Sequence, residues 1–259
     1  MSDKNSFTLK DVSKTFEETQ ALSSVSLSIE QGEIIALIGP SGAGKTTLLN
    51  ILSNIIQPDE GKVRIYGKAA AQYSSGRELA RKVGLMRQQF DLVGPLPVIH
   101  NVLAGKLGEW GLLKSMISFL FPRDKDEAAD ALERVGLLDK MYDKTSNLSG
   151  GEQQRVALAR LFLQKPQAIL ADEPVASLDP ARAEDIMSML VQMVQQEKQT
   201  LVASLHSIDL ARKYCNRLIA LKDGSIYFDL PTAEVTDQQL TGLYQLMESK
   251  DGATVAAFS

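Results

Sequence analysis

The segment at residues 39–46 restricts the possible folds of this chain more than any other feature. It reads Gly-Pro-Ser-Gly-Ala-Gly-Lys-Thr and fits the pattern G-x-x-x-x-G-K-[ST]. An apolar run at residues 34–38 precedes it, and a helical pattern at residues 48–56 follows. A strand, a glycine-rich turn and a helix in this order direct backbone N–H groups toward a polyphosphate. We therefore predict that a nucleoside triphosphate binds to Gly39, Pro40, Ser41, Gly42, Ala43, Gly44, Lys45, Thr46 and Thr47.

Composition and charge argue against several classes of protein. Of the 259 residues, 44% are hydrophobic and 23% are charged, as in a soluble globular domain. The net charge of −4 gives no sign of a broad basic face, so we expect no nucleic-acid partner. No apolar run approaches the roughly 18 residues of a membrane span, and the N-terminus lacks the apolar region of a secretory signal. We expect that the chain does not cross a membrane by itself.

The chain has one cysteine, Cys215, so an internal disulfide is impossible. Free cysteine fits a reducing cytosolic location. We expect its thiol to be a small core residue rather than a reactive group.

The order of sequence patterns predicts an α/β fold. The first 35 or so residues have β character, and alternation at residues 23–30 indicates a half-buried antiparallel strand. Residues 91–163 show helical patterns instead, as expected for a helical insertion. Strand and helix patterns then alternate again. They predict strands at residues 168–171, 200–205, 217–221 and 225–230, helices at residues 181–197 and 236–247, and a disordered tail from residue 249.

Two adjacent acids, Asp172 and Glu173, follow the apolar run at residues 168–171. They lie at the carboxyl end of a predicted strand, the edge at which ligands bind in α/β sheets. Asp172 would hold the hydration shell of Mg²⁺, and Glu173 would polarise the attacking water as general base. Acids after strands are common and usually only solvated, so it is the phosphate loop that favours the catalytic interpretation.

The string Leu-Ser-Gly-Gly-Glu-Gln-Gln-Arg at residues 148–155 points to a family. Its first residues alone would indicate only a loop and a helix N-cap. The whole string resembles the signature motif of ABC ATPases, with Glu152 where glutamine is commoner. A serine hydroxyl, glycine N–H groups and a helix N-terminus suit a second phosphate site. The residues assigned to this site are Ser149, Gly150, Gly151 and Gln153.

The resemblance to ABC ATPases covers residues 7–247 and implies binding of ATP with Mg²⁺. It implies a P-loop NTPase (RecA-like) core with an N-terminal antiparallel β subdomain and an inserted α-helical subdomain. We expect one ABC ATPase domain at residues 1–248. Its core would comprise residues 1–90 and 164–230, and its helical subdomain residues 91–163.

The same resemblance assigns further residues. Gln88 matches the Q-loop glutamine that reaches the Mg²⁺ and water site, and the adjacent Gln89 is the alternative. Asp179 belongs to a D-loop, and His206 matches the switch histidine that contacts the γ-phosphate. Phe16 stands where the family places an aromatic that stacks on adenine; a core phenylalanine in an edge strand is the alternative. The predicted catalytic set is Glu173, His206, Gln88 and Lys45, and the predicted Mg²⁺ ligands are Thr46, Gln88 and Asp172.

The resemblance also implies partners. In this family the signature motif of one subunit faces the phosphate loop of another, so one copy of each motif implies a head-to-tail homodimer. Transmembrane permease subunits, and indirectly a periplasmic or extracellular substrate-binding protein, would complete the transporter at the cytoplasmic face of the inner membrane. Residues 112–121 are apolar enough to dock on the membrane partner, although a core position in the helical block explains them equally well.

Other members of the family fit the sequence less well. Exporters usually carry fused membrane spans, translation factors carry two ATPase copies, and DNA-repair relatives carry long heptad insertions. The sequence shows none of these. A separately encoded importer subunit fits best, with a soluble ABC regulator as the rival.

Four stretches resemble the ATPases of bacterial phosphonate importers, a family that includes phosphite and related phosphorus-oxyanion importers. They are residues 101–105, 119–122, 171–180 and 204–206. The form Val-Ala-Ser-Leu-Asp-Pro in the third stretch is the most telling. The resemblance links the chain to this substrate class only through the similarity of sequences, because no residue of this subunit need touch a phosphonate. An importer for polar amino acids or another oxyanion is the alternative.

Overall fold

The computed structural model describes residues 4–73, 76–108, 124–176 and 178–244. Within them, a central six-stranded sheet has the strand order β10-β9-β3-β8-β7-β6. The strands from β9 to β6 run parallel, and β10 pairs with β9 antiparallel. The bounds are β3 (Ile34–Ile38), β6 (Val83–Met86), β7 (Ala168–Ala171), β8 (Thr200–Ser204), β9 (Arg217–Lys222) and β10 (Ser225–Pro231).

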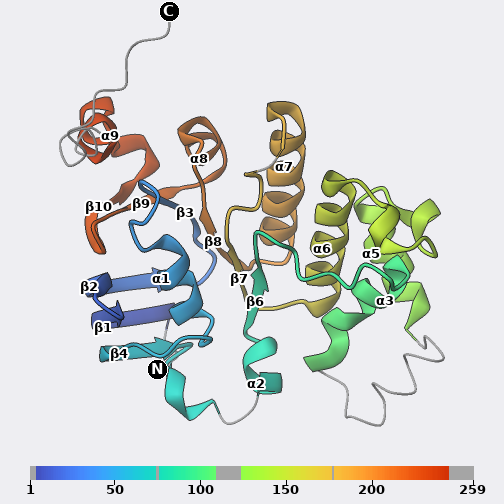
Figure 1. The fold of residues 1–259 in the computed structure, drawn as a ribbon, viewed down its shortest axis with the longest axis horizontal. Helices are drawn as coiled ribbons and strands as arrows, with labels where there is room; N and C mark the ends of the chain where they lie inside the picture. Colours follow the sequence, from blue (N-terminus) through green and yellow to red (C-terminus); the bar gives the residue numbers. More distant parts are fainter. Residues whose placement is uncertain (1–3, 74–75, 109–123, 177, 245–259) are drawn as a thin grey trace, which may run out of the picture.

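A second, four-stranded antiparallel sheet has the order β2-β1-β4-β5. Its strands are β1 (Asn5–Phe16), β2 (Thr19–Glu30), β4 (Glu60–Ile65) and β5 (Lys68–Ala69). The predicted alternation is confirmed, because Val25, Leu27 and Ile29 are buried while Ser24, Ser26 and Ser28 are exposed. This amphipathic sheet therefore covers one side of the molecule (Figure 1).

Helix α1 (Lys45–Leu52) lies in the core between the two sheets (Figure 1). Its Leu48, Leu49, Ile51 and Leu52 belong to one hydrophobic cluster with residues of both sheets. Burying each such side chain contributes about 1.5–3 kcal/mol. The helix that begins at the phosphate loop is thus fixed on both sides.

Side chains on the opposite face of the central sheet form a second hydrophobic cluster. This cluster also includes residues of α7 (Pro180–Gln196) and of α8 (Ile208–Tyr214). Beyond them, α3 (Val98–Leu103), α5 (Lys125–Arg134) and α6 (Gly150–Gln164) pack together, away from the four-stranded sheet (Figure 1). The remaining helices with assigned bounds are α2 (Gly76–Ala80) and α9 (Asp237–Tyr244). None of the helices in these described ranges is long and apolar enough to cross a membrane.

Most predicted elements are present, with differences at their ends. The helix expected at residues 48–56 begins earlier, at Lys45, and also ends earlier, at Leu52. It cannot continue through Asn54, because the φ of 59° at that residue lies in the left-handed region. The hairpin turn is confirmed, with φ of 47° at Asp223 and 75° at Gly224. Cys215 is buried, and burial raises the pKa of its thiol to about 12, which confirms a core role.

Several predictions fall wholly or partly outside the described residues, among them the helical insertion at residues 91–163, the stretch at residues 171–180 and the helix at residues 236–247. The docking segment at residues 112–121, the stretch at residues 119–122 and the tail from residue 249 lie entirely outside them. Helix α8 was not predicted, because it is short and only Ala211 is buried in it. Its one local signal is Ser207, whose side chain caps the helix by accepting from the N–H of Leu210.

Candidate functional site

The glycine-rich loop joins β3 to α1 and has the geometry that the sequence predicts. Gly39, Gly42 and Gly44 have φ of 145°, 78° and 101°. A Cβ at Gly39 would lie 2.2 Å from the carbonyl oxygen of Leu221, and one at Gly44 would lie 2.5 Å from that of Ala21. Glycine is therefore required at both positions by conformation and by space.

Lys45 is folded back into this loop. Its Nζ donates to the carbonyl oxygens of Gly39 at 2.7 Å and Pro40 at 3.0 Å, and the residue is only 6% exposed. Burial lowers the pKa of the ammonium, while the nearby carboxylates of Glu173 and Asp172 oppose this shift. A partly desolvated cation enclosed by the loop is a strong binding partner for a polyphosphate.

Asp172 follows β7 and lies beside the first turn of α1. Its Oδ1 accepts from the Thr46 hydroxyl at 3.3 Å and from the Ser204 hydroxyl at 2.8 Å. Among the described residues, no group of three or more His, Cys, Asp or Glu side chains could hold a metal ion. One carboxylate and one hydroxyl fit Mg²⁺, which usually binds through one or two carboxylates together with water and substrate phosphates.

Glu173 is held at both its backbone and its side chain. Its N–H donates to the Ser204 hydroxyl at 2.7 Å, and its Oε1 lies 2.7 Å from Nε2 of His206. Its φ of 49° lies in the left-handed region, which costs a non-glycine residue about 1–3 kcal/mol. The predicted base and switch histidine are therefore in direct contact, at the end of the strands where Asp172 also lies.

The Gln88 loop follows β6 and borders the same region. A cavity of about 200 Å³ is lined by Gln88, Phe90, Glu173 and the first glycines of α6. Gln88 lines this cavity, and the adjacent Gln89 is not among the described residues that line it. This difference favours Gln88 over Gln89 as the Q-loop residue.

Arg160 of α6 holds the Gln88 loop through two hydrogen bonds to its backbone. Its guanidinium donates to the carbonyl oxygens of Phe90 at 2.7 Å and Asp91 at 3.0 Å. Phe90 and Asp91 have φ of 54° and 48°, so two consecutive residues are in the left-handed region. Burial lowers the pKa of Arg160, as expected for a cation that serves as a structural clamp. The loop conformation thus depends on α6.

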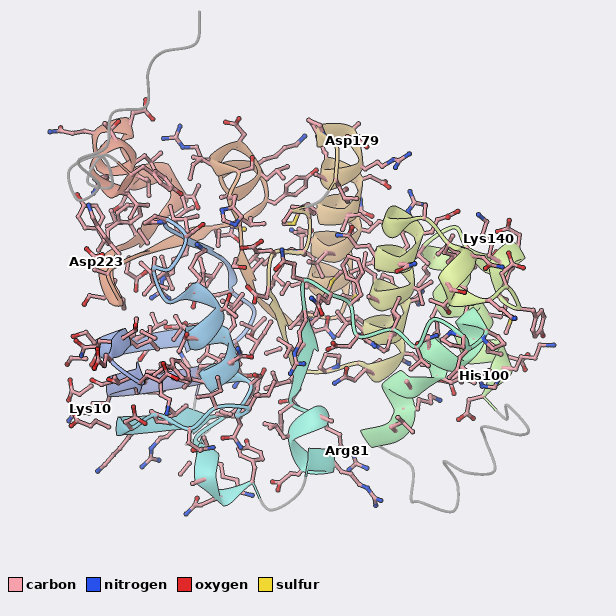
Figure 2. All side chains as sticks on the ribbon, in the orientation of Figure 1. Lys10, Arg81, His100, Lys140, Asp179 and Asp223 are labelled. Atoms are coloured by element: carbon pink, nitrogen blue, oxygen red, sulfur yellow. The ribbon has the colours of Figure 1, made fainter. Side chains whose placement is uncertain are left out.

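The signature segment begins α6 with a capping box. Ser149 is the N-cap, and Glu152 Oε2 accepts from its N–H and its hydroxyl, each at 2.8 Å. Glu152 also accepts a hydrogen bond from Lys140, which lies beside the first turn of α6 (Figure 2). These contacts, that with Lys140 first, lower the pKa of the Glu152 carboxyl to about 2. Gln153 instead donates to the Leu148 carbonyl oxygen at 3.1 Å.

Acid should weaken this cap. The pKa of Glu152 falls from 4.5 to about 2 on folding, so its contribution to stability is complete above pH 4.5 and is lost as pH falls toward 2. We expect Glu152→Gln to lower Tm by about 1–3 °C at pH 7, since exposed ion pairs contribute little. The difference between the two proteins should shrink at pH 3 in thermal unfolding followed by circular dichroism. A difference that stays constant between these pH values would contradict the prediction.

The two other predicted binding residues lie at exposed positions. Asp179 caps α7 by accepting from the Arg182 N–H at 3.1 Å (Figure 2). Phe16 ends β1 with 43% of its surface exposed, and the Lys14 ammonium lies 5.4 Å from its ring centroid. The alternative of a core phenylalanine is therefore wrong, and stacking on adenine stays a prediction.

The predicted residues around the phosphate loop contact one another, whereas the signature residues form no hydrogen bond with that loop in the described ranges. Contacts link Lys45, Thr46, Asp172, Glu173 and His206. In the described ranges, no hydrogen bond joins residues 149–151 to the phosphate loop. The signature end of α6 borders two cavities. Ser149 and Gly151 line one of about 310 Å³ together with residues of α7, and Gly150 and Gly151 line the cavity of about 200 Å³ that Gln88 and Glu173 also line.

The sequence analysis missed three residues that hold this site together: Ser204, Lys140 and Arg160. Only Ser204 carried a signal. It is a polar residue at the carboxyl end of an otherwise apolar strand, where ligand-binding groups of α/β sheets lie. The other two act through contacts between residues 12 and 70 positions apart, which no local pattern reveals.

Comparisons with known proteins agree with this geometry. The ABC transporter family matches residues 22–176. The phosphonates import ATP-binding protein PhnC 1 of Nostoc sp. is 44% identical over 240 residues, covering 91% of this chain and 91% of the relative. PhnC of Shouchella clausii is 40% identical over 239 residues, covering 91% of this chain and 90% of the relative.

Solved structures extend the similarity to the fold. A dimeric bacterial ABC transporter cassette matches with a TM-score of 0.76 at 34% identity, over 87% of this chain and 98% of the cassette. A post-hydrolysis state of the same cassette, bound to ADP and Pi, matches with a TM-score of 0.73 at 33% identity, again over 87% and 98%.

Proposed function

Because this chain belongs to the ABC transporter family, we propose that it is the ATP-hydrolysing subunit of an importer for phosphonates or related phosphorus oxyanions. The observation that carries the substrate class is the similarity, over about nine tenths of both chains, to curated relatives named as phosphonate import proteins. The cluster of Lys45, Asp172, Glu173 and His206 supports the hydrolytic part. An amino-acid importer or a soluble regulator has no comparable support.

In the proposed reaction, the loop N–H groups and Lys45 bind the β- and γ-phosphates of ATP. Thr46 and Asp172 would hold Mg²⁺, which neutralises charge on these phosphates. Glu173 orients the attacking water and accepts its proton as the bond to the γ-phosphate forms and ADP leaves. His206 lies 2.7 Å from the Glu173 carboxylate and keeps that group in position; in the proposed site it would also contact the γ-phosphate. Gln88 would complete the site from the cavity that it shares with Glu173.

We further propose that two copies bind ATP head to tail. Ser149 and Gly150 are exposed at the beginning of α6, where a hydroxyl and a helix N-terminus suit an anion. Within the described part of the chain, Ser149 lines the cavity of about 310 Å³ beside α7, and no hydrogen bond joins Ser149 or Gly150 to the phosphate loop. In the proposed dimer, Ser149, Gly150, Gly151 and Gln153 bind the partner's ATP, together with Asp179. Phe16 would stack on the adenine of its own subunit.

The proposed assembly includes membrane permease subunits and, indirectly, a substrate-binding protein outside the cytoplasmic membrane. The chain would lie on the cytoplasmic face of that membrane. We propose one domain at residues 1–248, with residues 91–163 as the helical part that contacts the permease. The clamp of Arg160 on the Gln88 loop supports a mechanical link between this part and the ATP site.

Uptake measurements test the substrate class. Deleting the gene for this chain should abolish ATP-dependent uptake of labelled 2-aminoethylphosphonate, and the wild-type chain should restore it. Glu173→Gln should not restore uptake, since hydrolysis is needed for turnover. Uptake of labelled glutamine and sulfate in the same cells is the specificity control. Loss of glutamine or sulfate uptake with unchanged phosphonate uptake would reject the proposed substrate and leave the ATPase assignment intact.

A further inference from the structure

Ser204 is a buried hydroxyl between the two acids of the ATP site. It is the last residue of β8 and has 0% exposure. Strands β7 and β8 are parallel, with Ala171 opposite Ala203, so the next residue on each strand brings Asp172 and Ser204 together. This register places a hydroxyl at the carboxyl edge of the sheet, beside the residues that carry the proposed chemistry.

The two hydrogen bonds of this hydroxyl have opposite directions. Ser204 Oγ donates to Asp172 Oδ1 at 2.8 Å and accepts from the Glu173 N–H at 2.7 Å. A hydroxyl has one proton and two lone pairs, so it can serve both neighbours at once. Both distances lie in the normal range for strong hydrogen bonds. An alanine here would leave the Glu173 N–H and one Asp172 oxygen without this partner at half-buried positions.

The hydrogen bond to Ser204, at the end of β8, holds the backbone conformation of Glu173. The N–H bond to Ser204 fixes the residue where its φ is 49°, a conformation that needs support from its surroundings. His206 follows Ser204 by two positions and holds the Glu173 carboxylate at 2.7 Å. The end of β8 therefore determines both the backbone and the side-chain position of the proposed base.

The same hydroxyl sets the position of Asp172. Oδ1 of this carboxylate is shared between the Ser204 hydroxyl and, at 3.3 Å, the hydroxyl of Thr46. Thr46 belongs to α1, which is fixed between the two sheets. One carboxylate oxygen is thus held from both sides, which limits rotation of the group.

We propose that Ser204 is a positioning residue for ATP hydrolysis, which holds Asp172 and Glu173 in one fixed arrangement through its two hydrogen bonds. This inference rests on the proposed function, because it assumes that Glu173 acts on water and that Asp172 holds Mg²⁺. Ser204 itself does not touch ATP in this scheme. It acts through the two acids, so its loss should affect the rate of hydrolysis more than the binding of nucleotide.

Steady-state kinetics of Ser204→Ala test the proposal. We expect kcat for ATP hydrolysis to fall about tenfold or more, since a positioned base contributes 10²–10⁴-fold, while KM for ATP changes less than about threefold. The Mg²⁺ concentration for half-maximal rate should rise. Ser6→Ala is the matched control, because Ser6 is equally buried and its hydroxyl bonds Thr200, at the other end of β8, at 2.7 Å. Its kcat should stay within about twofold of wild type.

A second pair of variants keeps the test valid if Ser204→Ala does not fold. Ser204→Thr retains the hydroxyl and Ser204→Val has the same shape without it, so their comparison isolates the hydrogen bonds. Thr should retain most of the rate and Val should lose it. Equal kcat for Thr and Val, or equal losses for Ser204→Ala and Ser6→Ala, would overturn the inference. Absence of hydrolysis in the wild type would reject the proposed function instead.

Discussion

Glu173→Gln should bind ATP with nearly wild-type affinity and lower kcat for hydrolysis by at least about 100-fold. The amide keeps the shape of the side chain and the contact with His206, which lies 2.7 Å from Oε1, but it cannot accept a proton from water. The loop and Lys45, which hold the phosphates in the proposed site, are unchanged. Phosphate release measures the rate, and calorimetry measures ATP affinity.

The same variant should accumulate as a dimer when ATP is added. If two subunits close on ATP and hydrolysis reopens them, a chain that binds without hydrolysing remains closed. Size-exclusion chromatography with light scattering should show a dimer with ATP and a monomer without it. Glu184→Gln is the control, since Glu184 is an exposed glutamate that pairs with Lys213 on the neighbouring α8. Wild-type turnover in Glu173→Gln would remove Glu173 as the base.

Lys45→Ala should weaken ATP binding about 10- to 100-fold. Hydrogen bonds to charged groups contribute about 1.5–3 kcal/mol, and Lys45 is the loop's only cation. Its ammonium is already partly desolvated, as the direction of its pKa shift indicates, so binding to phosphate requires little further loss of water. The hydrogen bonds to Gly39 and Pro40 are also lost, but they link residues of the same loop.

Calorimetry with ATP and Mg²⁺ measures this loss directly. Lys213→Ala is the matched control, because that lysine is exposed and forms an ion pair with Glu184 outside the loop. Its ATP affinity should equal that of the wild type. Unchanged affinity in Lys45→Ala, with a normal melting temperature, would contradict the role of the loop.

The sequence predicted the site best where the chemistry is local. The spacing of Gly39, Gly44 and Lys45 and the pair Asp172-Glu173 each lie within a few residues, and the structure brings the loop and the acids together. The alternation of apolar residues and serines at residues 23–30 likewise predicted most of β2, because its period is visible in eight residues. Residue types and short spacings were sufficient for these parts of the fold.

The parts that were missed depend on distant residues. Ser204 and Arg160 serve the site through partners 31 to 70 positions away. Helix α8 has one buried residue, too few to give a periodic signal. The left-handed conformation of Glu173 cannot be read from its residue type, since it is imposed by β8 and runs against the intrinsic preference of glutamate.

Helix α6 connects the signature segment at its N-terminus with the Gln88 loop, which it contacts near its C-terminus. Helix α6 has 15 residues, so it is about 22 Å long, with Ser149 before its first turn and Arg160 in its last third. Arg160 donates hydrogen bonds to the Gln88 loop, and Ser149 is the residue that would contact a second subunit in the proposed dimer. A helix of this length behaves as a stiff rod. In the proposed dimer, a partner that displaces the first turn of α6 would therefore also displace the Gln88 loop, without any change within the helix itself.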